Sequence, residues 1–130
     1  RSAQWADGVY AWSGNGERNE IHNTLLMADE AWKAAGRSET PYKLGGFWYS
    51  LTENAQQKLY DYCYDYLRIA GEDIARWVAE SVHRSSPDAV SEALDNLEAA
   101  GCEEAMLSPV TGELAEIEQL ARIVEQRSSN

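Results

Sequence analysis

The sequence has 130 residues, which is room for one domain with a substantial core. Acidic residues outnumber basic residues by 22 to 11, and the formal net charge is -11. Such a charge opposes attraction to phosphate backbones and to anionic membrane surfaces. We therefore expect no nucleic acid partner and no membrane partner.

The two cysteines, Cys63 and Cys102, form no CxxC pair and no Cys/His ligand spacing. This predicts free thiols in a reducing compartment and no metal site. No apolar run approaches the roughly 18 residues that cross a bilayer, and no signal peptide is visible. The sequence thus predicts a soluble, cytoplasmic protein.

Residues 1–8 lack an initiator Met and have the character of the last turns of a helix that Gly8 stops, so we expect a fragment. An apolar and aromatic run at 9–12 predicts a strand, and the turn residues at 13–16 predict a loop after it. Apolar side chains then recur at helical spacing and predict a helix over 17–35. They are Ile21, Leu25, Ala28, Trp32 and Ala35.

Residues 42–51 are rich in aromatic and aliphatic side chains without a helical period, which predicts a second strand. Gly45 and Gly46 inside it indicate a bulge, a bend, or a place where another group comes close to the backbone. Thr52 is placed to cap the next helix, and Gly71 separates that helix from a shorter one.

The segment from Ser85 to Thr111 carries the clearest local signals. Ser86 suits an N-cap, Pro87 suits the first helical position, and Gly101 suits the left-handed residue after a helix. The apolar run at 105–110 predicts a strand buried on both faces. A last helix is expected at about 113–126.

This order alternates strands and helices, which predicts an α/β fold with parallel strands in a single domain over 1–130. Ligands of such folds bind at the carboxyl ends of the strands, so the candidate loops are 12–17, 49–52 and 108–112. Their aromatic side chains can cover a flat ring, and their polar side chains can bond its edge. The candidates are Trp12, Ser13, Asn15, Trp48, Tyr49, Ser50, Ser108 and Thr111. The alternative is that the aromatics pack under loops and the hydroxyls cap helices.

Several stretches resemble the luciferase-like flavin-dependent oxidoreductases, which are (β/α)8 barrels that use FMN or a deazaflavin coenzyme. They occur in the order of that family's carboxyl-terminal part and cover nearly the whole chain. They are QWADGVYAW at 4–12, DEAWKAAGR at 29–37, FWY at 47–49, SSPDAV at 85–90 and LEAAGCEEAMLSPVTG at 97–112. The resemblance implies a partial TIM barrel of three parallel strands, the last three of eight, with flanking helices and an open sheet edge.

The resemblance implies a small-molecule substrate and FMN or deazaflavin as cofactor. It also implies that earlier strands supply most phosphate contacts, so we expect little or no flavin affinity in the isolated chain. No catalytic residue can be named, because His22 and His83 lack partners at a triad or metal spacing.

The resemblance therefore implies the carboxyl-terminal portion of a flavin- or deazaflavin-dependent monooxygenase or oxidoreductase, inactive as an isolated chain. The alternatives are a non-catalytic α/β module that binds a small molecule and one that dimerises. In either case we expect a homo-oligomer that covers the open sheet edge.

Overall fold

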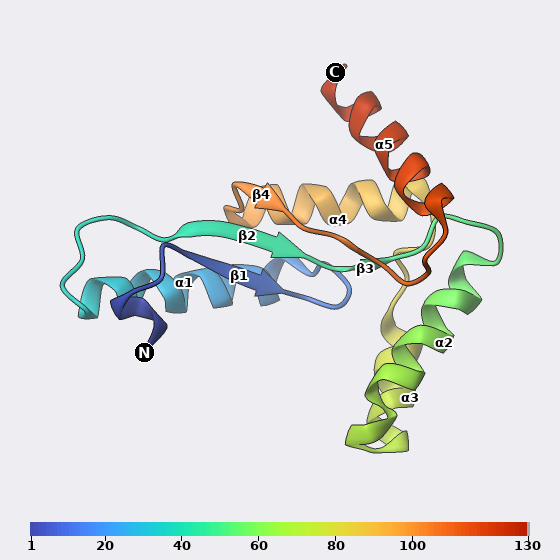
Figure 1. Ribbon diagram of the computed structural model, residues 1–130, viewed down its shortest axis with the longest axis horizontal. Helices are drawn as coiled ribbons and strands as arrows, with labels where there is room; N and C mark the ends of the chain where they lie inside the picture. The colour runs from blue at the N-terminus through green and yellow to red at the C-terminus, as the bar shows by residue number, and fades with distance from the viewer. Residues whose placement is uncertain (130) are drawn as a thin grey trace. The chain divides into compact units, whose positions relative to one another are not determined.

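The computed structural model describes residues 1–129 and divides the chain into two compact parts (Figure 1). The first part comprises residues 1–47 and 93–107, and the second part comprises residues 48–92 together with the chain from Ser108 onward. The helix α4 (Pro87–Ala100) contributes residues 87–92 to the second part and residues 93–100 to the first. The predicted single domain over 1–130 stays a prediction.

The first part contains a three-stranded parallel sheet in the order β1-β2-β4. The pairing of β1 with β2 runs from Gly8 opposite Tyr42 to Trp12 opposite Gly46, and Leu44 lies opposite Glu104 of β4. The elements are η1 (Ser2–Gln4), β1 (Gly8–Trp12), α1 (Arg18–Ala34), β2 (Tyr42–Gly46) and β4 (Glu104–Ala105). This confirms the predicted α/β fold with three parallel strands, flanking helices and an open sheet.

Both helices of the first part pack on one face of this sheet. Val9 packs against a buried cluster that includes Ala28 and Trp32 of α1. Gly45 lies on the same face, where an added Cβ would stand 2.6 Å from Cys102 Sγ and 3.1 Å from Leu97 Cγ. The sequence signal at Gly45 is thus explained by the close approach of α4 and the residue that follows it.

The second part has a two-stranded parallel sheet and a pair of packed antiparallel helices, α2 and α3 (Figure 1). In the sheet, Trp48 lies opposite Ser108 and Tyr49 lies opposite Pro109. The elements are β3 (Trp48–Tyr49), α2 (Ala55–Leu67), η2 (Arg68–Ala70), α3 (Glu72–Ser81), β5 (Ser108–Pro109) and α5 (Leu114–Ser128).

The helix signals around α4 are confirmed. The backbone N–H of Ala89 donates to Ser86 Oγ at 3.2 Å, which is the bond of an N-cap, and Gly101 adopts φ +104° after the last turn. Gly71 likewise adopts φ +121° where α2 and η2 give way to α3.

Two predicted strands are shorter than expected. Residues 42–51 form β2 and β3 with Phe47 between them, and residues 105–110 contribute to β4 and β5. The prediction that 105–110 is buried on both faces was wrong, because Ala105 and Met106 are exposed at the edge of their sheet.

Two predicted helix signals also failed. Gly8 is the first residue of β1 rather than a helix stop, and it makes room for Tyr42, whose carbonyl oxygen would stand 2.8 Å from an added Cβ. Thr52 does not cap α2, since Asn54 holds that position and Thr52 Oγ1 donates instead to Glu113 Oε2 at 2.9 Å. Within residues 1–129, no helix has both the length and the apolar character needed to cross a membrane.

Candidate functional site at the carboxyl ends of the strands

The loop after β1 is fixed by hydrogen bonds of its own backbone and of Ser13. Ser13 is 1% exposed; its N–H donates to Gly46 O at 3.1 Å, and its Oγ accepts from the N–H of Glu17 at 2.8 Å. Gly16 adopts φ +63°, and its carbonyl accepts from Asn96 Nδ2 at 2.9 Å. The Ser13 hydroxyl therefore holds Glu17, the residue that precedes α1, without capping the helix itself.

Aromatic side chains lie on the sheet face that α1 and α4 leave uncovered in the first part. The Tyr10 and Trp12 rings are 6.1 Å apart and tilted by 55°. Tyr10 is 44% exposed, and its hydroxyl donates to Met106 O at 2.8 Å. Partial burial raises the pKa of Tyr10, so its hydroxyl stays a donor at neutral pH. Gly46 is required here, because an added Cβ would collide with Tyr10 Oη and Met106 O.

The candidates in β3 and directly after it, in the second part, are buried. Trp48 packs edge-on against Tyr62 and Tyr66 of α2, with ring centroids 6.0 and 5.8 Å away. Tyr49 is fully buried and its hydroxyl donates to Glu116 O at 3.4 Å; burial and the nearby Glu116 charge raise the pKa of Tyr49 to about 12. Ser50 is also fully buried, and its Oγ has no hydrogen-bond partner among residues 1–129.

A network of charged and hydroxyl side chains closes the same end of the second part. Glu113 Oε2 accepts hydrogen bonds from Thr52 Oγ1 at 2.9 Å, Lys58 Nζ at 2.9 Å and Thr111 Oγ1 at 3.0 Å. Lys58 Nζ also donates to Thr52 Oγ1 at 2.9 Å. The bonds from Lys58, Thr52 and Thr111 lower the pKa of Glu113. Thr111 and Lys58 are therefore engaged with Glu113.

Glu116 brings a carboxylate into the interior of the second part. It is fully buried; its Oε1 accepts from the N–H of Leu51 at 2.6 Å, and its Oε2 lies 3.3 Å from Thr111 Oγ1. These bonds satisfy a charge that would otherwise be costly to bury. They also tie the loop after β3 to the first turn of α5.

Arg84 is a second buried ion in this part. It is 2% exposed, and its Nη1 donates to Ala89 O and Glu92 Oε2, each at 3.0 Å. The carbonyl of Arg84 accepts from the N–H of Ser50 at 3.1 Å. The backbone of Arg84 thereby holds the backbone of Ser50 in place.

The predicted candidates are distributed over both parts. Trp12, Ser13 and Asn15 belong to the first part, where Asn15 Nδ2 donates to Glu17 Oε1 at 2.8 Å. Trp48, Tyr49, Ser50, Ser108 and Thr111 belong to the second part, where the parallel pairing of β3 and β5 brings them to neighbouring strands. That they bind a ligand stays a prediction.

Sequence reasoning missed Glu113, Glu116 and Arg84. A signal for Glu116 does exist, because Leu120 and Ile123 follow it at helical spacing and Ile123 is buried. A carboxylate on the apolar face of an amphipathic helix is expected to be buried and bonded.

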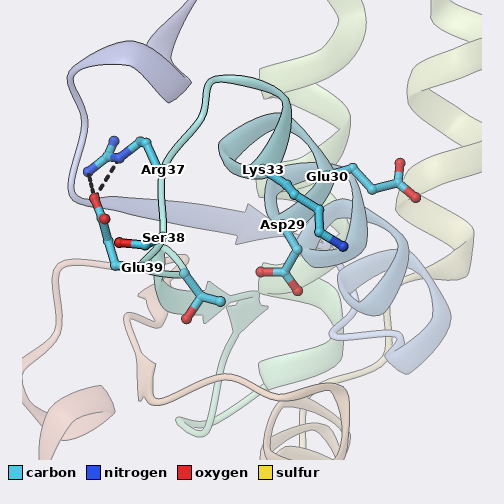
Figure 2. A pocket seen from close by; sticks show the side chains of 7 residues that line it. Asp29, Glu30, Lys33, Arg37, Ser38 and Glu39 are labelled. Atoms are coloured by element: carbon cyan, nitrogen blue, oxygen red, sulfur yellow. Dashed lines mark hydrogen bonds and ion pairs between the residues drawn. The ribbon is translucent and has the colours of Figure 1, made fainter.

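A cavity of about 280 Å³ lies at the other end of the first part, where α1 connects to β2 (Figure 2). Its lining residues are Asp29, Glu30, Lys33, Arg37, Ser38, Glu39 and Thr40. Arg37 Nη1 donates to Ala6 O at 2.6 Å and Ala3 O at 3.2 Å, and Figure 2 shows its pairing with Glu39. This end precedes the strands, so the cavity lies away from the edge where α/β folds bind ligands.

No metal centre is evident, since residues 1–129 contain no group of His, Cys, Asp and Glu side chains that could hold an ion. Both cysteines of the described chain are free, and burial raises the pKa of Cys63 to about 12. The thiol of Cys63 is accordingly protonated and unreactive at neutral pH.

Comparison with known proteins gives one result for the fold. No family model and no curated protein matches the sequence. A solved structure, described as an F420-dependent secondary alcohol dehydrogenase in complex with an F420-acetone adduct, matches with a TM-score of 0.66 at 12% sequence identity. The match covers 93% of this chain and 43% of that protein. The match confirms the predicted resemblance at the level of the fold, as an open α/β sheet that corresponds to part of a TIM-barrel enzyme.

Proposed function

We propose that this chain is the carboxyl-terminal portion of an oxidoreductase that uses FMN or a deazaflavin coenzyme and acts on a small molecule. The fold match over 93% of the chain carries this proposal. Because the chain spans only 43% of the matched dehydrogenase, we propose that it lacks activity on its own.

The residues of the first part fit the ring of such a cofactor. Tyr10 and Trp12 present aromatic surface on an uncovered sheet face, and flat heteroaromatic rings stack on such surface. In the second part, the Ser50 hydroxyl is buried without a partner, a state that a polar ligand atom can relieve. A bound flavin or deazaflavin would carry the redox chemistry itself, and Tyr10 and Trp12 would orient its ring.

The cations near the loops of the second part are not placed to bind a phosphate group. Lys58 is bonded to Glu113 and Thr52, and Arg84 is buried against Glu92 and Ala89. The carboxylates of Glu113 and Glu116 further disfavour an anion near the loops of the second part. We therefore expect weak binding that depends on the ring.

Titration with riboflavin and FMN, followed by the quenching of flavin fluorescence, tests this. We expect the two compounds to bind within about twofold of each other, because neither gains from phosphate contacts. Trp12→Ala should weaken both, whereas Trp77→Ala, on an exposed side chain of α3, should leave both unchanged. Equal binding to the wild type and Trp12→Ala, or a thermal shift with an unrelated compound only, would favour the non-catalytic binding module.

The exposed edge strand supports a second candidate, a module that dimerises. Ala105 and Met106 are exposed beside β2, where strands usually find a partner. We propose that a second copy covers this edge. Sedimentation equilibrium should then show a dimer that Ala105→Pro disrupts, since proline removes a ladder N–H. A monomer over the accessible concentration range would contradict it.

We further propose a cytoplasmic location. The free state of Cys63 and Cys102 supports it, because reducing compartments keep thiols unpaired. Alkylation of the denatured protein after rapid acid quenching of cells should find both thiols reduced, with denaturant exposing the buried Cys63.

A further inference from the structure

The last helix, α5, has apolar side chains on two different sides. One side faces the second part: Glu116 and Ile123 are buried, Leu120 is half-buried, and Arg127 Nη1 donates to Ser91 Oγ at 2.8 Å. These contacts fix how the helix is rotated about its axis. Any apolar residue on another side is therefore held toward solvent.

Such residues form a continuous stripe. Leu114, Ile117, Ala121 and Val124 follow one another at spacings of three, four and three. Leu114 is 71% exposed, Ile117 is 52% exposed and Val124 is 48% exposed. The alternation of three and four is the a/d pattern by which one helix packs along another. We call these residues the α5 seam.

The seam has an acidic border. Glu118 and Glu125 follow the a/d residues at the flanking e positions, one heptad apart, and both are exposed. The g positions differ: Glu113, just before the helix, is bonded to Lys58, and Leu120 and Arg127 lie on the side that packs on the second part, so the acidic border is the e side. Residues at e and g contact the flanks of a partner helix and decide which partner is accepted.

A second copy of the chain does not suit this border. In a parallel pairing, e positions face g positions, so Glu118 would meet Glu113 and Glu125 would meet Leu120, and neither pair joins opposite charges. In an antiparallel pairing, e positions face each other and would again bring glutamates together. The net charge of -11 on each copy adds to this repulsion.

We propose that the α5 seam docks an amphipathic helix of another protein segment, one with apolar residues at its a and d positions and lysine or arginine at its flanks. The apolar stripe supplies the contact area, and the carboxylates select the basic partner.

The test uses two synthetic helical peptides of about 20 residues, with leucine at a and d and either lysine or glutamate at e and g. Binding is followed by the fluorescence anisotropy of the labelled peptide. We expect the lysine peptide to bind about tenfold tighter than the glutamate peptide, with the advantage shrinking as salt is raised. In the lysine series, Glu118→Gln with Glu125→Gln should remove most of that advantage.

Ile117→Asp and Val124→Asp should each weaken lysine-peptide binding by about tenfold or more, since either places a charge in the seam. Ile74→Asp, at a similarly exposed apolar residue of α3, is the matched control and should bind normally. Circular dichroism verifies that each variant is folded.

Equal binding of both peptides, or binding of neither, would overturn the proposal. Self-association of the wild-type chain that Ile117→Asp abolishes and Ala105→Pro leaves intact would also overturn it, by showing that a second copy occupies the seam.

Discussion

A buried serine follows a strand in each part of the molecule, and the two serines are held differently. Ser13 follows β1 in the first part, and its Oγ accepts the N–H of Glu17 at 2.8 Å. Ser50 follows β3 in the second part, and its Oγ has no partner among the described residues. Both side chains are at most 1% exposed. Burial alone therefore does not show whether a hydroxyl stabilises the fold or is available to bond a ligand.

The wider surroundings of the two serines differ in the same way. In the first part, close backbone packing at Gly16, Gly45 and Gly46 fixes the strand ends and leaves aromatic rings on the uncovered face. In the second part, carboxylates fix the strand ends and engage the nearby hydroxyls. The first part should therefore be destabilised by side chains that add volume. The second part should be destabilised by the loss of these hydrogen bonds or by a change of pH.

The largest effect is expected from added volume beneath the first sheet. Gly45→Val places atoms where Cys102 Sγ and Leu97 already lie, so at least about 3 kcal/mol of unfolding free energy should be lost. Gly112→Ala is the control, because no described atom lies within 4 Å of its added Cβ. Urea unfolding measures both, and a loss below 1 kcal/mol for Gly45→Val, about the cost of a well-accommodated swap, would contradict the packing argument.

Removing the buried carboxylate of the second part should cost less. Glu116→Leu replaces the carboxylate with an apolar side chain and leaves the N–H of Leu51 without its acceptor, which should cost about 1–3 kcal/mol in urea unfolding. Glu116→Gln retains an oxygen acceptor and should lose a smaller amount. If Leu proved as stable as the wild type, the carboxylate would not be what holds the loop after β3.

Features of the fold differ in how far they could be predicted from the sequence. Ser86 and Gly101 sit next to the helix that they delimit, so local chemistry was sufficient to predict both ends of α4. Gly45 could be predicted to accept a close approach, although not from which residue. Glu116 binds Leu51, which is 65 residues away, and such a pairing depends on the tertiary fold alone. The split of 42–51 into β2 and β3 depends in the same way on which strands pair.

Ser13→Ala should cost about 1 kcal/mol, because the N–H of Glu17 at the start of α1 loses its acceptor. Ser13→Thr is the rescue variant, since it keeps the hydroxyl oxygen. Hydrogen exchange at the Glu17 amide provides a local readout, and unchanged protection in Ser13→Ala would show that this bond is dispensable.

The Glu113 network should make the stability of the second part depend on pH in the acidic range. The pKa of Glu113 lies below its ordinary value of 4.5, so the stabilisation is present above that pH and is lost as pH falls through the lower, folded-state pKa. Between about pH 5 and about pH 3, the unfolding free energy of the wild type should fall more steeply than that of Glu113→Gln. Glu118→Gln, at an exposed glutamate of the same helix, should keep the wild-type slope.

Ser50→Ala should have the smallest effect on folding and the sharpest bearing on function. Since Ser50 Oγ has no partner among residues 1–129, its removal should change the unfolding free energy by at most about 0.5 kcal/mol in either direction. The same variant should weaken riboflavin binding if the hydroxyl bonds the polar edge of a ring, whereas Ser13→Ala should not. A loss of stability as large as that of Ser13→Ala would mean that Ser50 serves the fold. If both stability and binding were unchanged, the buried Ser50 hydroxyl would serve neither the fold nor the ligand. The two serines would then differ only in how their side chains are packed.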